Sequence, residues 1–458
     1  MMRWRPPGLT QRVLVRLALH RPELRAWALY DWANSAMVTT VVASVFPIYY
    51  YKVAGAGLPP GVATQRFALC TTIALATTAV LAPFLGIVAD FTAAKKKFLA
   101  AFLVLGAGAV AAMFCIDAGE WRLASVLYVL ANVGAAGSAV FYDSLLPHVA
   151  RDDELHRLST SAYALGYLGG GLLLGLQAAW IAHPGWLGLP SGPDLPARAQ
   201  TLPVRLALAS VAGWWLIFSL PLFRRVPEPR VADPRPWNGA TLAAAARHFA
   251  HTLRHLRSYR HAFLFMAAFL LYNDGLQTII KMASIYGAEI GIGSQALLVA
   301  ILLVQFVGIP CTLLFARVAE RWGVKPTLAV TLAAYAGIAV FAFFMRTAAH
   351  FFALAIAVGC VQGGCQALSR STFATLIPAR HSSEFFGFFA VAEKFAGILG
   401  PACFAVAIQF TGSSRTAILS VLVFFVTGAV LLRGVDLKAG RADAQRAGGE
   451  DSSAATAL

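Results

Sequence analysis

Long runs of apolar residues, each about the length of a membrane-spanning helix, alternate with short polar segments along the chain. A helix needs roughly 20 apolar residues to cross the hydrocarbon core of a bilayer, and twelve runs reach that length. The pattern therefore predicts an all-α integral membrane protein with 12 transmembrane helices in two sets of six. The first set covers 27–51, 66–90, 98–118, 122–147, 159–182 and 203–223, and the second covers 261–287, 295–319, 326–346, 350–377, 384–410 and 415–433.

The polar segments complete the predicted division of the chain. We expect a basic N-terminus (1–26), a first bundle (27–223), a central loop (224–260), a second bundle (261–433) and a disordered tail (434–458). Within the central loop, 239–258 has the pattern of a basic amphipathic helix lying along the inner leaflet. His251 and His255 lie four residues apart there, but no third ligand is evident, so no metal site is predicted.

The distribution of positive charge tests the helix count. With the N-terminus placed in the cytoplasm, 27 of the 37 Lys and Arg residues fall on the cytoplasmic side and 7 on the opposite side. Cytoplasmic loops carry such an excess, and a missed helix would invert the bias downstream of it. We therefore expect both termini in the cytoplasm. Most of these residues are Arg, which favours a bacterial source and hence a bacterial cytoplasmic membrane.

Composition excludes several classes of protein. Hydrophobic residues make up 59% of the chain and charged residues only 13%, too few charges for the surface of a soluble globule and too many apolar residues for a disordered chain. The net charge of +16 lies in clusters between apolar runs, without a basic-aromatic module that would bind nucleic acid. The six cysteines form no CxxC pair and are expected to be reduced thiols, and arginines from position 12 onward break any signal peptide.

No nucleotide-binding, metalloprotease or serine-hydrolase motif is present in the sequence. We therefore expect neither an enzyme nor a cofactor, and any transport must draw on a gradient of substrate or ions.

An internal repeat relates the two sets of spans. A motif after the second span recurs after the eighth at an offset of 230, and further matches follow at 231. Parallel six-helix repeats are the plan of major facilitator transporters, so the sequence predicts two pseudo-symmetric six-helix bundles. We expect the acidic and basic residues of the repeated motif to act as gate latches at the cytoplasmic ends; they are Asp90, Lys95, Glu320 and Lys325.

Polar residues within the spans identify a candidate binding cavity, because a charge at the centre of a helix costs roughly 2.5–3.5 kcal/mol to insert. On the first span, Asp31 and Asn34 lie three residues apart and Tyr30 lies one turn below Asn34. Asn273 and Asp274 hold the matching place on the seventh span. We expect these residues to line a central cavity formed by helices 1, 4, 7 and 10.

Two rows of polar and charged residues, one on the seventh span and one on the tenth, can each be interpreted in more than one way. Asp274, Gln277 and Lys281 follow one helical face, either as a static pair or as groups that bind substrate or protons. Gln362, Gln366 and Arg370 recur every four residues, and Arg370 is a candidate for binding the carboxylate of an amino acid.

Two carboxylates within the predicted spans are possible partners of Arg370. The alternative for Arg370 is a structural ion pair with Asp143 or Glu393. Glu393 lies on the face of two glycines, where close helix approach could desolvate it, and is a proton-coupling candidate together with Asp31 and Asp274.

Several longer motifs resemble one family. The segments WALYDWANSA (27–36), FPIYY (46–50), YNDGLQTII (272–280), GGCQALSRSTFATLIP (363–378), EFFGFF (384–389) and KFAGILGP (394–401) are similar to the vacuole-effluxer-like branch of the major facilitator superfamily. The resemblance implies the major facilitator fold. It also implies that the protein exports amino acids. It marks as motif positions Tyr30, Asp31, Asn34, Asn273, Asp274, Gln277, Gln366 and Arg370.

The predicted function is therefore a secondary transporter that moves a small solute by alternating access, with amino-acid efflux as the leading hypothesis. Its expected partners are a small-molecule substrate, protons as candidate coupling ions and the lipid bilayer, and it is expected to work as a monomer. Two alternatives stay open. One is an exporter of another small amphipathic solute or drug, and the other is a membrane receptor or sensor that does not transport.

Overall fold

The computed structural model describes residues 9–456 apart from 60–61, 191, 193–194, 232, 255–258, 290–293, 397–398 and 412–416. The helices up to the central loop are α1 (Leu9–Arg16), α2 (Pro22–Ala36), η1 (Met37–Ser44), α3 (Val45–Tyr49), η2 (Tyr50–Ala54), α4 (Val62–Thr92), α5 (Lys95–Ala112), η3 (Met113–Cys115), α6 (Trp121–Ser144), α7 (Leu146–Val149), α8 (Leu155–Ala182), η4 (Pro184–Leu187), α9 (Ala197–Gln200) and α10 (Leu202–Arg225).

The remaining helices begin in the central loop. They are α11 (Gly239–Arg254), α12 (Arg260–Glu289), α13 (Ser294–Trp322), α14 (Val324–Phe343), α15 (Ala348–Thr375), η6 (Ala379–His381), α16 (Ser382–Phe395), α17 (Leu399–Thr411), η7 (Ile418–Val421), α19 (Leu422–Gly434) and α20 (Leu437–Thr456). We call α2 to α10 the first half and α12 to α19 the second half.

The long helices have the composition of membrane spans. Among the described residues, ten helices are long and apolar enough to cross a membrane, and the bent pair Ile418–Gly434 and Leu437–Arg446 raises the number to eleven when it is taken as one span. The predicted span at 384–410 corresponds to α16 and α17, and of the residues between them 397–398 lie outside the description. Large apolar side chains such as Val80 and Phe410 are exposed, as expected for helices that face lipid.

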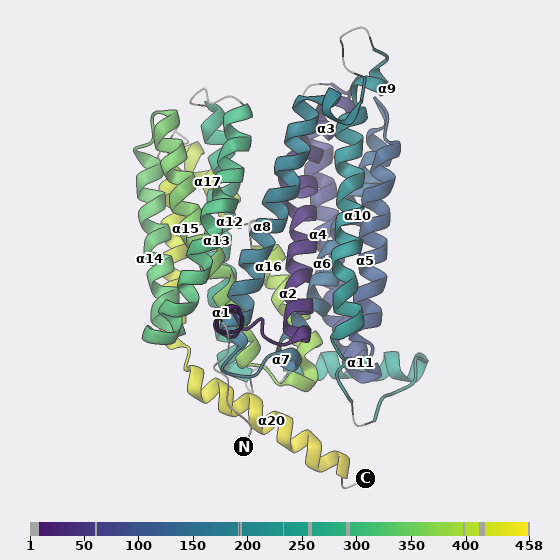
Figure 1. The fold of residues 1–458 in the computed structure, drawn as a ribbon. Helices are drawn as coiled ribbons and strands as arrows, with labels where there is room; N and C mark the ends of the chain where they lie inside the picture. The colour runs from purple at the N-terminus through teal and green to yellow at the C-terminus, as the bar shows by residue number, and fades with distance from the viewer. Residues whose placement is uncertain are drawn as a thin grey trace.

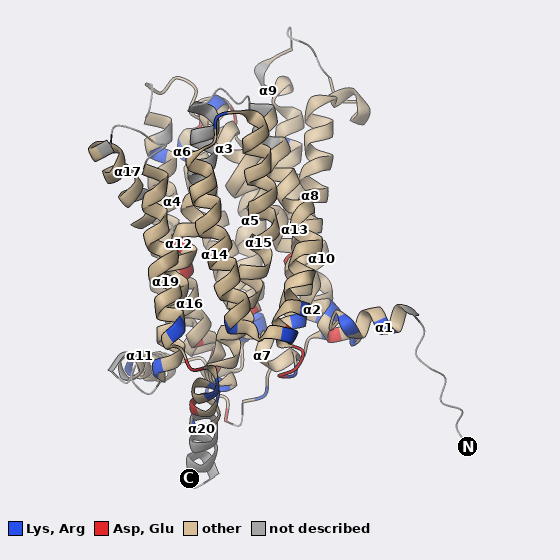
Figure 2. Cartoon of the chain, turned by 90° about the vertical axis from the view of Figure 1, so that its left-hand side faces the viewer, with Lys and Arg blue, Asp and Glu red and all other residues tan. Residues whose placement is uncertain are grey.

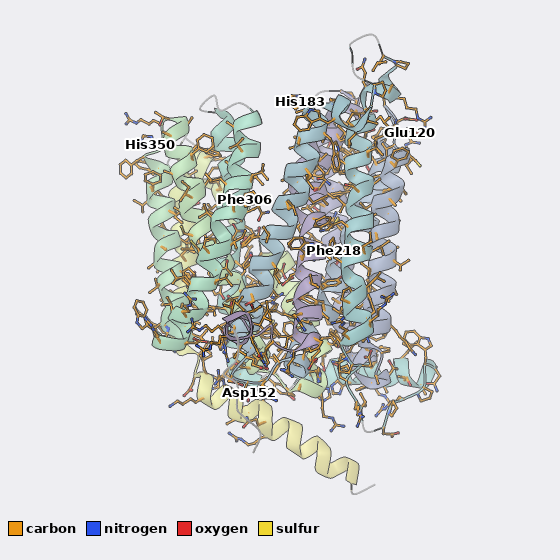
Figure 3. All side chains as sticks on the ribbon, in the orientation of Figure 1. Glu120, Asp152, His183, Phe218, Phe306 and His350 are labelled. Carbon is orange, nitrogen blue, oxygen red and sulfur yellow. The ribbon has the colours of Figure 1, made fainter. Side chains whose placement is uncertain are left out.

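The two halves stand side by side, and both termini lie at the same end of the molecule, which we call the terminal end (Figure 1). Many of the Lys and Arg residues lie near this end in Figure 2. Helices α11 and α20 also lie there, whereas His183 and His350 mark the opposite end in Figure 3. The positive-inside rule predicts that the terminal end faces the cytoplasm.

The halves touch closely through α4 and α16. A Cβ added to Gly86 of α4 would lie 2.3 Å from the carbonyl oxygen of Ser383, and one added to Gly387 of α16 would lie 2.6 Å from the Cα of Pro83. Glycine at both positions therefore permits a backbone approach that any larger residue would prevent. Helix α8 of the first half also packs on α13 and α15 of the second.

The two helices at the terminal end have different attachments. Helix α11 packs on α4 through the buried residues Ile87, Val88 and Ala245, which form a small apolar cluster. Helix α20 occupies a segment for which the sequence predicts a disordered tail. Its alanines favour a helix, and Gly440 lies against His261 and Leu376 of the second half, so its first turns have a surface to pack on.

Candidate functional site

A buried arginine at the junction of the two halves is the centre of the candidate site. Arg370 of α15 is only 4% exposed, and its guanidinium donates to Asp31 Oδ2 at 2.9 Å and to Asp143 Oδ1 at 3.2 Å. Its Nε donates to Ser159 Oγ at 3.0 Å, and a terminal nitrogen donates to the carbonyl of Ser159 at 3.2 Å. Because these partners lie on α2, α6 and α8, all four contacts run from the second half to the first.

Aromatic rings surround the same guanidinium. The Arg370 Cζ atom lies 4.4 Å from the ring centroid of Tyr163, 5.0 Å from Trp27 and 5.6 Å from Tyr142. Trp27 and Tyr30 stack on Tyr142 with centroids 4.4 and 4.6 Å apart. Cation–π contacts contribute about 0.5–1 kcal/mol each at exposed sites and about 2 kcal/mol when desolvated. The rings therefore hold the cation in place while leaving its charge to the carboxylates.

The formal charges in this cluster do not cancel. Arg370 is always protonated, and Asp31 and Asp143 together carry two negative charges when both are ionised. Both carboxylate side chains keep 15% exposure, so the cluster is not sealed. Glu393 of α16 is half-buried and lies close enough to Asp143 for their charges to interact. The surplus of negative charge can be neutralised by a proton or by a cationic group of a substrate.

Three predicted residues present polar atoms without hydrogen-bond partners among the described residues. They are the hydroxyl of Tyr30, the Oδ1 of Asn34 and both amide atoms of Asn273, which is 1% exposed. Leaving a buried polar group without a hydrogen bond costs about 1–3 kcal/mol. A polar ligand that bonded to these groups would recover that free energy. Gln277 on α12 and Gln366 on α15 are half-buried.

Asp274 has a structural contact. Its carboxylate is fully buried and accepts a hydrogen bond from the backbone N–H of Gly400 at 2.8 Å, in the first turn of α17. A carboxylate at a helix N-terminus is favoured by the helix dipole. The side chain of Lys281, predicted as its partner on the same face, lies outside the described part of the chain.

Asp90 and Lys95, predicted to act as a gate latch, lie in contact in the structure, and their hydrogen bonds reach the second half. Lys95 is 2% exposed and forms an ion pair with Asp90, and it also donates to Ser382 Oγ at 2.8 Å and Ser383 Oγ at 3.0 Å. Asp90 accepts the backbone N–H groups of Ser383 and Glu384. The acid therefore caps α16, the partner helix of the close approach at Gly86.

The second copy of the motif is arranged differently. Glu320 forms an ion pair across the halves with Arg157 of α8, at 3.2 Å, while its side chain is 50% exposed. Lys325 instead donates to the carbonyls of Arg433 and Val435 at 2.7 Å, at the end of α19. Asp90 and Lys95 thus contact each other, whereas Glu320 and Lys325 contact other partners, and the gate role of all four residues stays a prediction.

Several residues of the site were not singled out from the sequence. Ser159 and Tyr163 lie one helical turn apart on α8 and face Arg370, and Trp27 lies one turn before Asp31 on α2. Their spacing fits one face of a helix, but the sequence does not indicate which span that face meets.

Comparisons with known proteins agree with this architecture. The model of the "Vacuole effluxer Atg22 like" family matches residues 58–445. An uncharacterized MFS-type transporter of Bacillus subtilis, YxiO, is 37% identical over 89% of this chain and 93% of its own length. Autophagy-related protein 22 of Coccidioides immitis is 24% identical over 83% of this chain and 74% of its own.

Solved structures show the same fold. The major facilitator superfamily transporter FucP, in the outward conformation, has a TM-score of 0.65 at 13% identity, with 91% of this chain and all of FucP covered. The proton:xylose symporter XylE has a TM-score of 0.66 at 13% identity, with 93% and 96% covered. The predicted fold class and family are confirmed: this chain is a multi-pass membrane transporter of the major facilitator superfamily and belongs to the Atg22-like vacuole effluxer family.

Proposed function

We propose that this transporter exports amino acids or closely related zwitterions by alternating access, with Arg370 and its two aspartates as the recognition site. The observation that carries the proposal is the pair of contacts at 2.9 and 3.2 Å from one guanidinium to Asp31 and Asp143. A guanidinium beside carboxylates is complementary to a group that carries a carboxylate and an ammonium close together. The name of the matched family favours efflux as the direction.

The same contacts link binding to movement of the halves. Breaking a buried ion pair without compensation costs about 3–5 kcal/mol, so the halves resist separation while Arg370 is held. A zwitterion can offer its carboxylate to Arg370 and its ammonium to Asp31 or Asp143, and thereby replace both partners at once. Binding would then release the contact between the halves at little net cost.

Protons are the proposed coupling ions. The surplus negative charge around Arg370 gives a proton a place on Asp31, Asp143 or the nearby Glu393. Loss of that proton restores the ion pairs and returns the transporter to the state described here. We propose that it works as a monomer in a bacterial cytoplasmic membrane with both termini in the cytoplasm.

The test is uptake of labelled neutral amino acids by proteoliposomes, with and without an imposed pH gradient. We expect Arg370→Lys to lower uptake on the order of 10–100-fold, because an ammonium loses the two-pronged, charge-assisted contact with carboxylates. The matched control is Arg198→Lys, since Arg198 is 67% exposed and pairs with Asp117 at the surface.

The uptake experiment also distinguishes amino-acid transport from the two alternative functions. Uptake that Arg370→Lys leaves unchanged would refute the recognition site. Absence of amino-acid uptake by folded protein would refute the substrate class, and a screen of amphipathic solutes would then decide between another exporter and a protein that binds without transport.

A further inference from the structure

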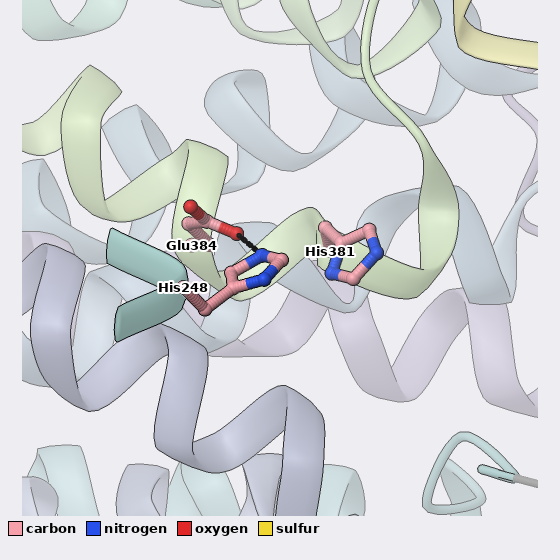
Figure 4. Close-up of side chains that lie close together, drawn as sticks. All are labelled: His248, His381 and Glu384. Carbon is pink, nitrogen blue, oxygen red and sulfur yellow. Dashed lines mark hydrogen bonds and ion pairs between the residues drawn. The ribbon is translucent and has the colours of Figure 1, made fainter. Parts of the chain in front are cut away.

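A second cluster of titratable side chains lies at the terminal end, outside the central site. His248 of α11, His381 of η6 and Glu384 of α16 place one possible ligand atom each within 4.8 Å of one another, and Figure 4 shows the three side chains together. His248 Nε2 lies 3.1 Å from Glu384 Oε2. The two imidazole rings are stacked with centroids 5.2 Å apart. Three segments of the chain thus converge on one small volume.

The carboxylate of Glu384 is buried and only partly hydrogen-bonded among the described residues. Its side chain is 1% exposed, and while Oε2 contacts His248, Oε1 is buried without a hydrogen-bond partner among the described residues. The backbone N–H of Glu384 is already bound by Asp90 at 3.0 Å. Buried carboxylates are normally paired with cations or coordinate metals, so a second positive ligand for this carboxylate is favoured.

We propose that His248, His381 and Glu384 form a binding site for a divalent transition-metal ion such as Zn²⁺. Two imidazoles and one carboxylate are ligands that Zn²⁺ accepts, and a water molecule completes four-coordination. With bonds of about 2.0–2.1 Å, ligand atoms around a tetrahedral ion lie about 3.3 Å apart. The His248–Glu384 pair already has this spacing, and the half-buried ring of His381 closes the remaining gap by rotating out of its stack.

The position of the site gives the ion a role in transport. Helix α11 is fixed to α4 of the first half by the apolar cluster that contains Ala245, while Glu384 belongs to α16 of the second half. A bound ion therefore joins the two halves where α4 and α16 already meet. An ion that binds only this state at 100 times its Kd shifts the equilibrium toward it about 100-fold. This consequence rests on the proposed alternating access, whereas binding of the ion does not.

Binding is tested on the full-length, tag-free protein after treatment with a chelator. Titration calorimetry with Zn²⁺ is expected to show a site in the wild type that His248→Ala and His381→Ala each weaken at least about tenfold. Both histidines are half-buried, so their truncation leaves the buried Glu384 in place. The matched control is His183→Ala, because His183 is exposed at the opposite end of the molecule. Co²⁺ should give a tetrahedral visible spectrum only in the wild type and the control.

Two results would overturn the site. Unchanged Zn²⁺ affinity in His248→Ala and His381→Ala would mean that the ion binds elsewhere. Thermal stability that depends on His248 and on pH but not on Zn²⁺ would mean that the cluster is a proton-bearing ion pair.

In proteoliposomes, Zn²⁺ should slow transport by the wild type but not by His248→Ala. Binding without any transport would leave the metal site standing and refute the proposed function alone.

Discussion

Replacing Arg370 by Met tests whether the central cluster is an energetic link between the halves. The substitution leaves Asp31 and Asp143 facing each other without their cation. Removal of one partner of a buried pair costs about 3–5 kcal/mol, and since both carboxylates keep 15% exposure, we expect about 3 kcal/mol. The triple variant with Asp31→Asn and Asp143→Asn removes the stranded charges and should recover most of that loss.

The assay is denaturant-induced unfolding in detergent micelles, followed by tryptophan fluorescence. Arg198→Met is the control, because its pair with Asp117 is largely exposed and should be worth no more than about 1 kcal/mol. The reasoning fails if Arg370→Met is as stable as Arg198→Met, or if the triple variant is no more stable than Arg370→Met alone. Either result would mean that the cluster does not hold the halves together.

Three further predictions concern the terminal end. Gly86→Ala places a Cβ 2.3 Å from the carbonyl of Ser383, so distances between spin labels on α4 and α16 should lengthen there; Gly108→Ala, with open space around it, should leave them unchanged. Burial raises the pKa of the Glu228 carboxyl, so Tm should fall as the pH rises above the ordinary pKa of a glutamate. Glu228→Gln removes this ionisation and should make that fall less steep. A Tm that keeps the same pH slope would contradict this. Lys325→Ala should cost about 1 kcal/mol of unfolding free energy by uncapping α19 and leave transport unchanged, whereas a large transport defect would assign Lys325 to the gate.

Local patterns in the sequence predicted the fold and singled out two charged residues that the structure places together. Span length and the repeat depend only on the order of residues, and the charges of Asp31 and Arg370 stand out because apolar spans exclude charges without a function. Both residues lie in one cluster in the structure. The sequence left open whether Arg370 pairs with a carboxylate or awaits a substrate, because that choice depends on which helices meet.

Contacts between distant segments could not be predicted in this way. Ser159 carries no signal as a partner of an arginine that lies 211 positions away. The sequence drew attention to His251 and His255, which are neighbours on one predicted helix, whereas the structure groups His248 with His381 and Glu384 from another part of the chain. Helical periodicity identifies residues that share a face of one helix, but it contains no information about what packs on that face.

The two copies of the repeated motif, predicted to act as gate latches, make contacts that differ in burial and therefore in energy. Asp90 and Lys95 are 1% and 2% exposed, and losing either charge leaves the other buried. Glu320 is 50% exposed, so its pair with Arg157 is screened by water and worth no more than about 1 kcal/mol. The contacts that Asp90 and Lys95 make with the first turn of α16 are therefore better shielded from water than the contact between α8 and α13. Under the proposed alternating access, a ligand bound at the first turn of α16 should therefore change a more strongly shielded contact than one bound at α13.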